Sequence, residues 1–178
     1  MTILHPTTYP NSRKGRLSDY QAEIRRLAYA IKDPACRCPD IETAALTMAG
    51  LIHGPCWLVP IPTSNGSLIP NARLAAAIAS HVPGAQMVPA LARTQPIPSQ
   101  CLLHRANLPA IPADQHHIRA TGRNLGLRQV YFVDNVATSG NTMAAAFAAL
   151  GHGAGLVFAA TANHPTSRAE ESLFTQTH

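Results

Sequence analysis

Short apolar runs and helical apolar repeats alternate along most of the chain. The apolar runs predict strands at residues 57–60, 86–90, 129–134 and 155–161. Apolar residues at helical spacing predict helices at residues 18–33, 41–54, 71–82 and 141–150. Strands that alternate with helices favour an α/β fold with a central parallel sheet and helices on its faces. In such sheets ligands bind beyond the carboxyl ends of the strands.

Residues that begin and end helices support the first two helical predictions. Ser18 is expected to cap the first helix, with Gln21 completing a capping box, and Asp33 precedes the proline that stops it. Asp40 is expected to cap the second helix, which Gly54 and the following proline stop.

Two segments lack either pattern. Residues 1–16 are polar, basic and contain proline, which predicts a loose N-terminal arm. Residues from about 93 to 126 are polar, basic and rich in proline, with little periodicity. A stretch of that length inside a compact domain is usually functional or mobile. We therefore expect one domain over residues 1–178, with a mobile segment at 93–126.

Composition narrows the class of partner. The chain has 178 residues, of which 46% are apolar, and its 14 basic residues outnumber its 9 acidic ones. The pI of about 9.4 indicates an anionic partner, either a phosphorylated small molecule or nucleic acid, unless the surface is merely basic. No apolar run has the roughly 18 residues of a membrane span. The first residues lack a signal-peptide core, so we expect a cytoplasmic protein.

Several cysteines, histidines and arginines have alternative interpretations. Cys36 and Cys38 have C-x-C spacing without a second close pair, which favours reduced thiols over a metal site or disulfide. The nine histidines would form a metal or proton-shuttling cluster only if the fold gathered them, and scattered surface positions are the simpler interpretation. Arg119, Arg123 and Arg128 form either a nucleic-acid patch or a solvated basic loop, and the scarcity of aromatic residues favours the loop.

The stretch VYFVDNVATSGNT, residues 130–142, places polar side chains at the exit of an apolar strand. A glycine-centred turn of small hydroxyl residues at a helix start can direct backbone N–H groups at an anion. The acid Asp134 beside this turn is suited to accept hydrogen bonds from sugar hydroxyls or to lie near Mg²⁺. The combination predicts a ribose 5-phosphate site. A plain turn with serine and threonine caps is the alternative.

This stretch resembles the phosphoribosyl diphosphate (PRPP) binding motif of type I phosphoribosyltransferases. That motif has four apolar residues, two acids, two apolar residues and then T-T/S-G-x-T. The order of LVPIP, an Asn/Arg-containing helix, LARTQPIPSQ and RANLPA resembles the ComF-like branch of that family. The likeness covers roughly residues 57–160 and implies a type I phosphoribosyltransferase-like fold with a small hood over the sheet edge.

The resemblance implies a role for each matching position. Asp134 and Asn135 would bind the ribose hydroxyls, and Arg93 and Arg105 would close over the pyrophosphate. The 5-phosphate would be held by Thr138, Ser139, Gly140, Asn141 and Thr142. The pyrophosphate loop would consist of Ile61, Pro62, Thr63 and Ser64. Mg²⁺ would arrive with PRPP, near Asp134, without a ligand set of the protein's own.

Three positions depart from the family pattern. The second acid of the motif is Asn135, which adds no charge and cannot act as a base. Thr138 stands where some purine-using members carry an acid. The N-terminal zinc-ribbon cysteines of many ComF-like proteins are missing.

Two classes of function therefore stay open. One is an enzyme that transfers a phosphoribosyl group to an unidentified base or amine and releases pyrophosphate. The other is a PRPP- or nucleotide-binding accessory protein of the competence type, with little catalysis. No aromatic platform for a base is evident in the sequence, and a homodimer is compatible with either class.

Overall fold

The computed structural model describes residues 1–10, 16–33, 38–99, 102–103 and 106–161. Its helices are α1 (Asp19–Lys32), α2 (Cys38–Ala49), α3 (Ile69–His81), the 3₁₀ helix η2 (Ala113–His116) and α5 (Asn141–Leu150). Its strands are β1 (Ile3–Leu4), β2 (Thr7–Thr8), β3 (Cys56–Pro60), β4 (Gln86–Met87), β5 (Leu91–Arg93), β6 (Ile118–Ala120), β7 (Gln129–Ala137) and β8 (Ala154–Ala160).

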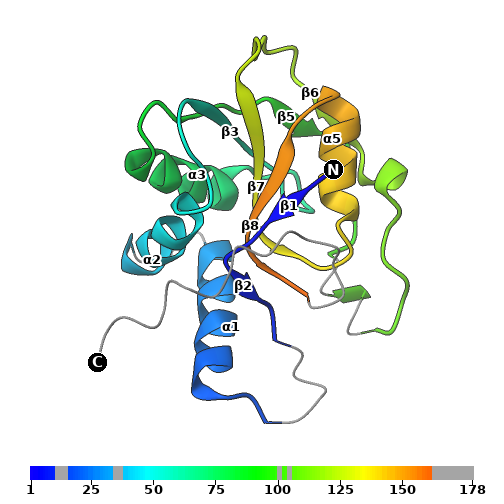
Figure 1. Cartoon of the computed structure of the whole chain (residues 1–178). Coiled ribbons are helices and arrows are strands. Elements are labelled where there is room, and N and C mark those ends of the chain that lie inside the picture. Colours follow the sequence, from blue (N-terminus) through cyan, green and yellow to red (C-terminus); the bar gives the residue numbers. More distant parts are fainter. Residues whose placement is uncertain (11–15, 34–37, 100–101, 104–105, 162–178) are drawn as a thin grey trace.

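Six of these strands form one sheet in the order β1-β8-β7-β3-β4, with β2 also pairing with β8 (Figure 1). Every described pair in this sheet is parallel. The expected α/β fold with a central parallel sheet is therefore confirmed. The other two strands, β5 and β6, form a separate antiparallel pair.

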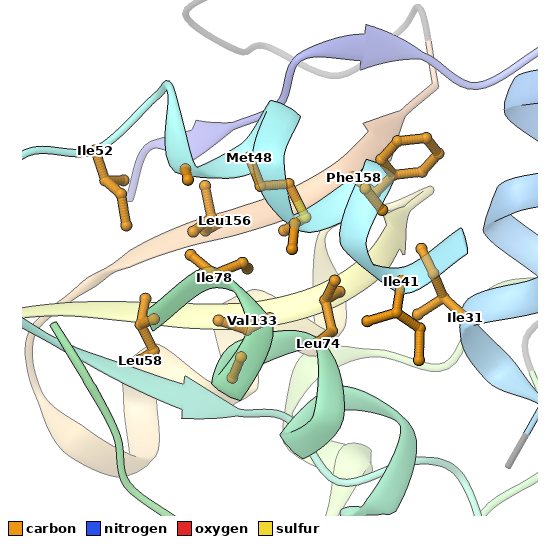
Figure 2. Packing of buried hydrophobic residues seen from close by; sticks show 14 of the residues in the cluster. Ile31, Ile41, Met48, Ile52, Leu58, Leu74, Ile78, Val133, Leu156 and Phe158 are labelled. Atoms are coloured by element: carbon orange, nitrogen blue, oxygen red, sulfur yellow. The ribbon is translucent and has the colours of Figure 1, made fainter. Parts of the chain in front are cut away.

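The helices cover the two faces of the sheet and bury two separate cores. On one face α1, α2 and α3 pack around a core that includes Ile31, Met48, Ile78, Val133 and Phe158 (Figure 2). On the other face lies α5, as Figure 1 shows, and its Met143 and Ala146 belong to the second core with Val59, Phe132 and Val157. This two-layer burial anchors β3 and β7 in the middle of the sheet.

The N-terminal arm that the sequence predicts is wrong for the described part of residues 1–16. β1 and β2 pair in parallel with β8, in the registers Ile3 to Gly155 and Thr7 to Ala159. Ile3, His5 and Thr7 are buried at every second position, as expected of a strand. The alternation is hard to recognise in the sequence because two of the buried positions carry polar side chains.

Three other sequence expectations have different outcomes. The capping box of Ser18 is confirmed, since Ser18 Oγ accepts from the Gln21 N–H at 3.2 Å. Asp40 does not cap α2, which begins at Cys38. Its carboxylate instead accepts from Arg26 Nη2 of α1 at 2.8 Å. The strand predicted at 86–90 is shorter, because only Gln86–Met87 pairs with β3 before a proline interrupts the ladder.

The segment at 93–126, called the hood segment below, carries more regular structure in its described part than its sequence indicated. It contains η2 and β6, and β6 pairs with β5 from Leu91 to Arg93. The mobility predicted for this segment stays a prediction. Among the described residues, no helix combines the length and the apolar character that crossing a membrane requires.

Candidate functional site

The candidate site lies where β3 ends beside β7. These strands are parallel neighbours, with Pro60 opposite Val133, and the Ile61 N–H donates to the Val133 carbonyl at 3.0 Å. The loop that follows β3 therefore starts next to Asp134 in β7. Residues far apart in sequence meet here because both strands run in the same direction.

Asp134 is half-buried and is held by its Oδ1 atom. The Asn135 backbone N–H donates to Oδ1 at 2.8 Å, and Asn71 Nδ2 donates to it at 3.1 Å. Among the described residues these are its hydrogen-bond donors, so Oδ2 is available to a ligand hydroxyl. Desolvation raises the pKa of Asp134. That rise is opposed by Lys32, the Asn135 N–H, Asn71 and Arg93.

Asn71 is a candidate site residue that the sequence analysis did not single out. It is the third residue of α3, and its side chain is 4% exposed. Its Nδ2 atom donates both to the Ile61 carbonyl at 2.8 Å and to Asp134 Oδ1 at 3.1 Å. The available signal was an amide on the buried stripe that Leu74 and Ile78 continue. A polar residue at such a position needs a polar partner.

Arg93 occupies a different place from the one expected. Its guanidinium donates from Nε to the Thr63 carbonyl at 2.8 Å and from Nη2 to the Pro62 carbonyl at 3.1 Å. Its Nη1 atom donates to the His116 carbonyl. The side chain thus fastens the loop after β3 to η2, instead of pointing freely over a ligand. Desolvation lowers the pKa of Arg93, and Asp134 opposes that shift.

The placement of Asn135 contradicts its predicted role in ligand binding. Asn135 lies within β7, which continues past both polar residues to Ala137. Asn135 is 3% exposed, and its Nδ2 atom donates to the Ala28 carbonyl of α1 at 2.8 Å. It therefore tethers a core helix to β7 and does not accompany Asp134 toward a ligand. The other predicted arginine, Arg105, lies outside the described residues.

The turn at residues 138–142 leads from β7 into α5 as expected. Thr138 and Ser139 are exposed, and Gly140 has a φ of 75°, which favours glycine. Gly140 provides no side-chain cap for α5. Helix starts leave backbone N–H groups without partners inside the helix, so the arrangement suits an anion.

Polar contacts tie this turn to its surroundings. Ser139 Oγ accepts from the Asn141 N–H at 3.4 Å, and the Thr138 carbonyl accepts from Thr161 Oγ1 at 2.9 Å. Asn141 Nδ2 donates to the carbonyl of Ile111 in the hood segment at 2.7 Å. Thr142 is half-buried at the start of α5. The side chain of Asn141 thus contacts the hood segment.

His116, in the hood segment, shares partners with the loop after β3 and with the start of α5. It is 1% exposed, its Nε2 atom lies 3.3 Å from the same Ile111 carbonyl, and its own carbonyl accepts from Arg93. Its Nδ1 atom has no hydrogen-bond partner among the described residues. Desolvation and the charge of Arg93 lower its pKa. No pattern in the sequence distinguishes this histidine from the others.

The structure thus brings together most of the predicted positions. Ile61, Pro62 and Thr63 contact Asn71 or Arg93 through their carbonyls, and the Ser64 carbonyl accepts from the Ile97 N–H at 2.9 Å. Asn71 joins Asp134 to this loop, and β7 leads from Asp134 to the 138–142 turn. In the part of the chain that the structure describes, no three His, Cys, Asp or Glu side chains gather as a metal site.

Comparisons with protein-family models, with curated proteins and with solved structures each find no match. Function therefore rests on the chemistry of the site. At the carboxyl ends of the strands the site offers one carboxylate oxygen, a helix start whose first N–H groups lack partners within the helix, and a loop held from two sides. Arg128, by contrast, stacks 4.6 Å over the ring of Trp57 near the start of β3, at the opposite edge.

Proposed function

We propose that this protein is a PRPP-dependent phosphoribosyltransferase with a type I phosphoribosyltransferase-like fold. The observation that carries the proposal is the position of Asp134. Asn71 joins its carboxylate to the loop after β3, and β7 leads from Asp134 into the glycine turn that begins α5. PRPP has three groups that match these neighbours: a pyrophosphate, two ribose hydroxyls and a 5-phosphate.

Each part of the site then has a task. The 5-phosphate binds to the backbone N–H groups at Ser139–Thr142, where the partial positive charge of a helix start favours an anion. The ribose hydroxyls donate to Oδ2 of Asp134. The pyrophosphate lies on the loop Ile61–Ser64, which Asn71 and Arg93 hold in place.

The chemical step is displacement of pyrophosphate from C1 of the ribose by a nitrogen acceptor. A transition state of this kind gains from positioning and from charge stabilisation. Mg²⁺ commonly takes one or two carboxylates together with substrate phosphates. Asp134 is the one carboxylate among the candidate site residues, which fits a cation carried mainly by the substrate. When bound, Mg²⁺ would neutralise the leaving pyrophosphate. The hood segment, fastened through Arg93 and His116, would exclude water.

One observation favours the second candidate, a PRPP-binding accessory protein with little catalysis. The guanidinium of Arg93 is committed to three backbone carbonyls, so its charge is partly compensated before any ligand arrives. Asn135 no longer favours this candidate, because its side chain faces α1 and not the site.

Calorimetric titration with PRPP and Mg²⁺, followed by a pyrophosphate-release assay with a panel of bases and amines, tests both candidates. The parent should be compared with Asp134→Asn and with Asp19→Asn, a matched loss of one carboxylate in the exposed first turn of α1. A lost charge-assisted hydrogen bond contributes about 1.5–3 kcal/mol. We therefore expect Asp134→Asn to bind PRPP about tenfold more weakly or worse, and Asp19→Asn to match the parent.

The outcomes separate the candidates. Binding together with pyrophosphate release for at least one acceptor supports the enzyme. Binding without release for any acceptor supports the accessory protein. A parent that does not bind PRPP, or an Asp134→Asn variant that binds it as tightly as the parent, overturns the proposal.

A further inference from the structure

Asn71 donates one amide group to two acceptors that belong to different parts of the site. One acceptor is the Ile61 carbonyl in the loop after β3, and the other is Oδ1 of Asp134 in β7. Both acceptors carry negative charge or partial negative charge, so they repel each other unless a donor lies between them. An Asn amide nitrogen has the two protons that this arrangement requires.

We propose that Asn71 is a positioning residue that orients the Asp134 carboxylate and couples it to the loop after β3. The inference rests on the proposed function in one respect: under it, Asn71 joins the ribose-binding acid to the pyrophosphate-binding loop. Because Oδ1 is fixed by Asn71 and by the Asn135 N–H, Oδ2 is directed to the ligand. Groups that are held before binding need less reorganisation when the ligand arrives.

The surroundings of Asn71 make this position specific for its amide. It is 4% exposed and lies next to Pro70 in the first turn of α3, so the backbone fixes where its side chain can reach. An aspartate here would place a third acceptor between two others. An alanine would leave the carbonyl and the carboxylate facing each other without a donor.

The charged groups that face Asp134 are Lys32 at the end of α1 and Arg93 in β5. Neither is changed by substituting Asn71. The bond from Asn71 lowers the pKa of Asp134, so its loss should move the titration of that carboxylate to higher pH. A residue that only stabilised the fold would not produce this shift.

The test compares Asn71→Ala with Asn135→Ala. Both changes remove a buried amide that donates to a backbone carbonyl, but only the Asn71 side chain contacts the Asp134 carboxylate. NMR titration of the Asp134 carboxyl carbon in the ligand-free protein measures the pKa of this group, which responds to loss of the hydrogen bond from Asn71. Calorimetry with PRPP and Mg²⁺ at neutral pH reports the functional consequence.

We expect the titration of Asp134 to move to higher pH in Asn71→Ala and to stay in place in Asn135→Ala. We also expect PRPP binding to weaken about tenfold in Asn71→Ala alone, in line with the loss of a charge-assisted hydrogen bond. If Asn71→Ala does not fold, Asn71→Ser keeps one donor and should give a smaller shift in the same direction.

If Asp134 titrates at the same pH in the parent and in the Asn71 variant, the inference is overturned, whether or not PRPP binding changes. A shifted titration in a protein that does not bind PRPP overturns the proposed function and leaves the orienting role of Asn71 supported. The opposite result is also informative. If the Asp134 titration is unshifted in Asn71→Ala, while the parent binds PRPP and Asp134→Asn does not, the orienting role of Asn71 is overturned and the proposed function is supported.

Discussion

Replacing Asn135 by aspartate tests the assignment of this side chain to the core. The two side chains have nearly the same shape, so the change is electrostatic. In the parent, Nδ2 donates to the Ala28 carbonyl at 2.8 Å, in surroundings where Asn135 is 3% exposed. In Asn135→Asp, a carboxylate oxygen that cannot donate faces that same carbonyl.

The magnitude follows from the burial. A buried polar group that loses its partner costs about 1–3 kcal/mol, and more when it is charged. We expect the free energy of unfolding at neutral pH to fall by at least about 2 kcal/mol. For a domain of this size that corresponds to a decrease in melting temperature of roughly 4–8 °C.

The loss of unfolding free energy in Asn135→Asp should depend on pH. Burial and the facing carbonyl raise the pKa of the carboxyl introduced at position 135 above its unfolded value of about 3.9. The folded state then binds more protons than the unfolded state between the two values, so stability falls as pH rises through that window. A protonated carboxyl can donate to the Ala28 carbonyl, which partly restores the bond. The deficit should therefore be smallest near about pH 4 and largest at neutral pH.

Thermal unfolding followed by circular dichroism over this pH range measures the effect. The matched control is Asn124→Asp, since Asn124 is exposed and its Oδ1 atom already accepts from the Gly126 N–H at 2.9 Å. There the same chemical change keeps the acceptor and should leave the melting temperature unchanged. If Asn135→Asp is as stable as the parent at neutral pH, the placement of Asn135 against α1 is wrong.

Three other predictions concern the site and the hood segment. Gly140→Val should abolish PRPP binding in calorimetry while the far-ultraviolet spectrum is retained, because valine disfavours the φ of 75° at the start of α5. The free energy of unfolding of the parent should fall as pH drops below the ordinary histidine pKa of about 6.5, because the pKa of buried His116 is lowered and the unfolded state then binds more protons. In thermal unfolding over that pH range, His116→Gln should lose less stability than the parent. Arg93→Lys cannot reach three carbonyls at once, so hydrogen exchange of residues 106–120 should become faster, and equal exchange in both proteins would contradict the fastening role of Arg93.

Much of the fold could be predicted because local signals agreed with burial. The apolar runs at β3, β7 and β8 lie side by side, and the capping box of Ser18 begins α1 where expected. β1 and β2 could not be recognised in this way, because His5 and Thr7 occupy buried positions that aliphatic residues usually take. Their partner is β8, about 150 residues later in the chain, and no local pattern reports such a pairing.

The site was predictable in its backbone and less so in its side chains. Asp134 and the 138–142 turn follow from the order of strand, acid, glycine and helix. The prediction for Asn135 failed because the strand was expected to end at residue 134. β7 extends to Ala137, so Asn135 lies inside the strand, where its amide donates to the Ala28 carbonyl of α1. Asn71 was missed because its two acceptors come from other elements.

Two buried amides fasten elements of the candidate site to the core helices. Asn135 ties β7 to α1 on one face, and Asn71 ties Asp134 and the loop after β3 to α3. Helices α1 and α3 belong to the same core, so the direction of the Asp134 carboxylate depends on core packing as well as on its own strand. A position defined in this way persists without a ligand, and preorganised polar groups of this kind would suit the ligand of the proposed function. Asn135, which stands at the position of the second acid in the resemblance, therefore anchors β7 to α1, and Asp134 is the carboxylate of the candidate site.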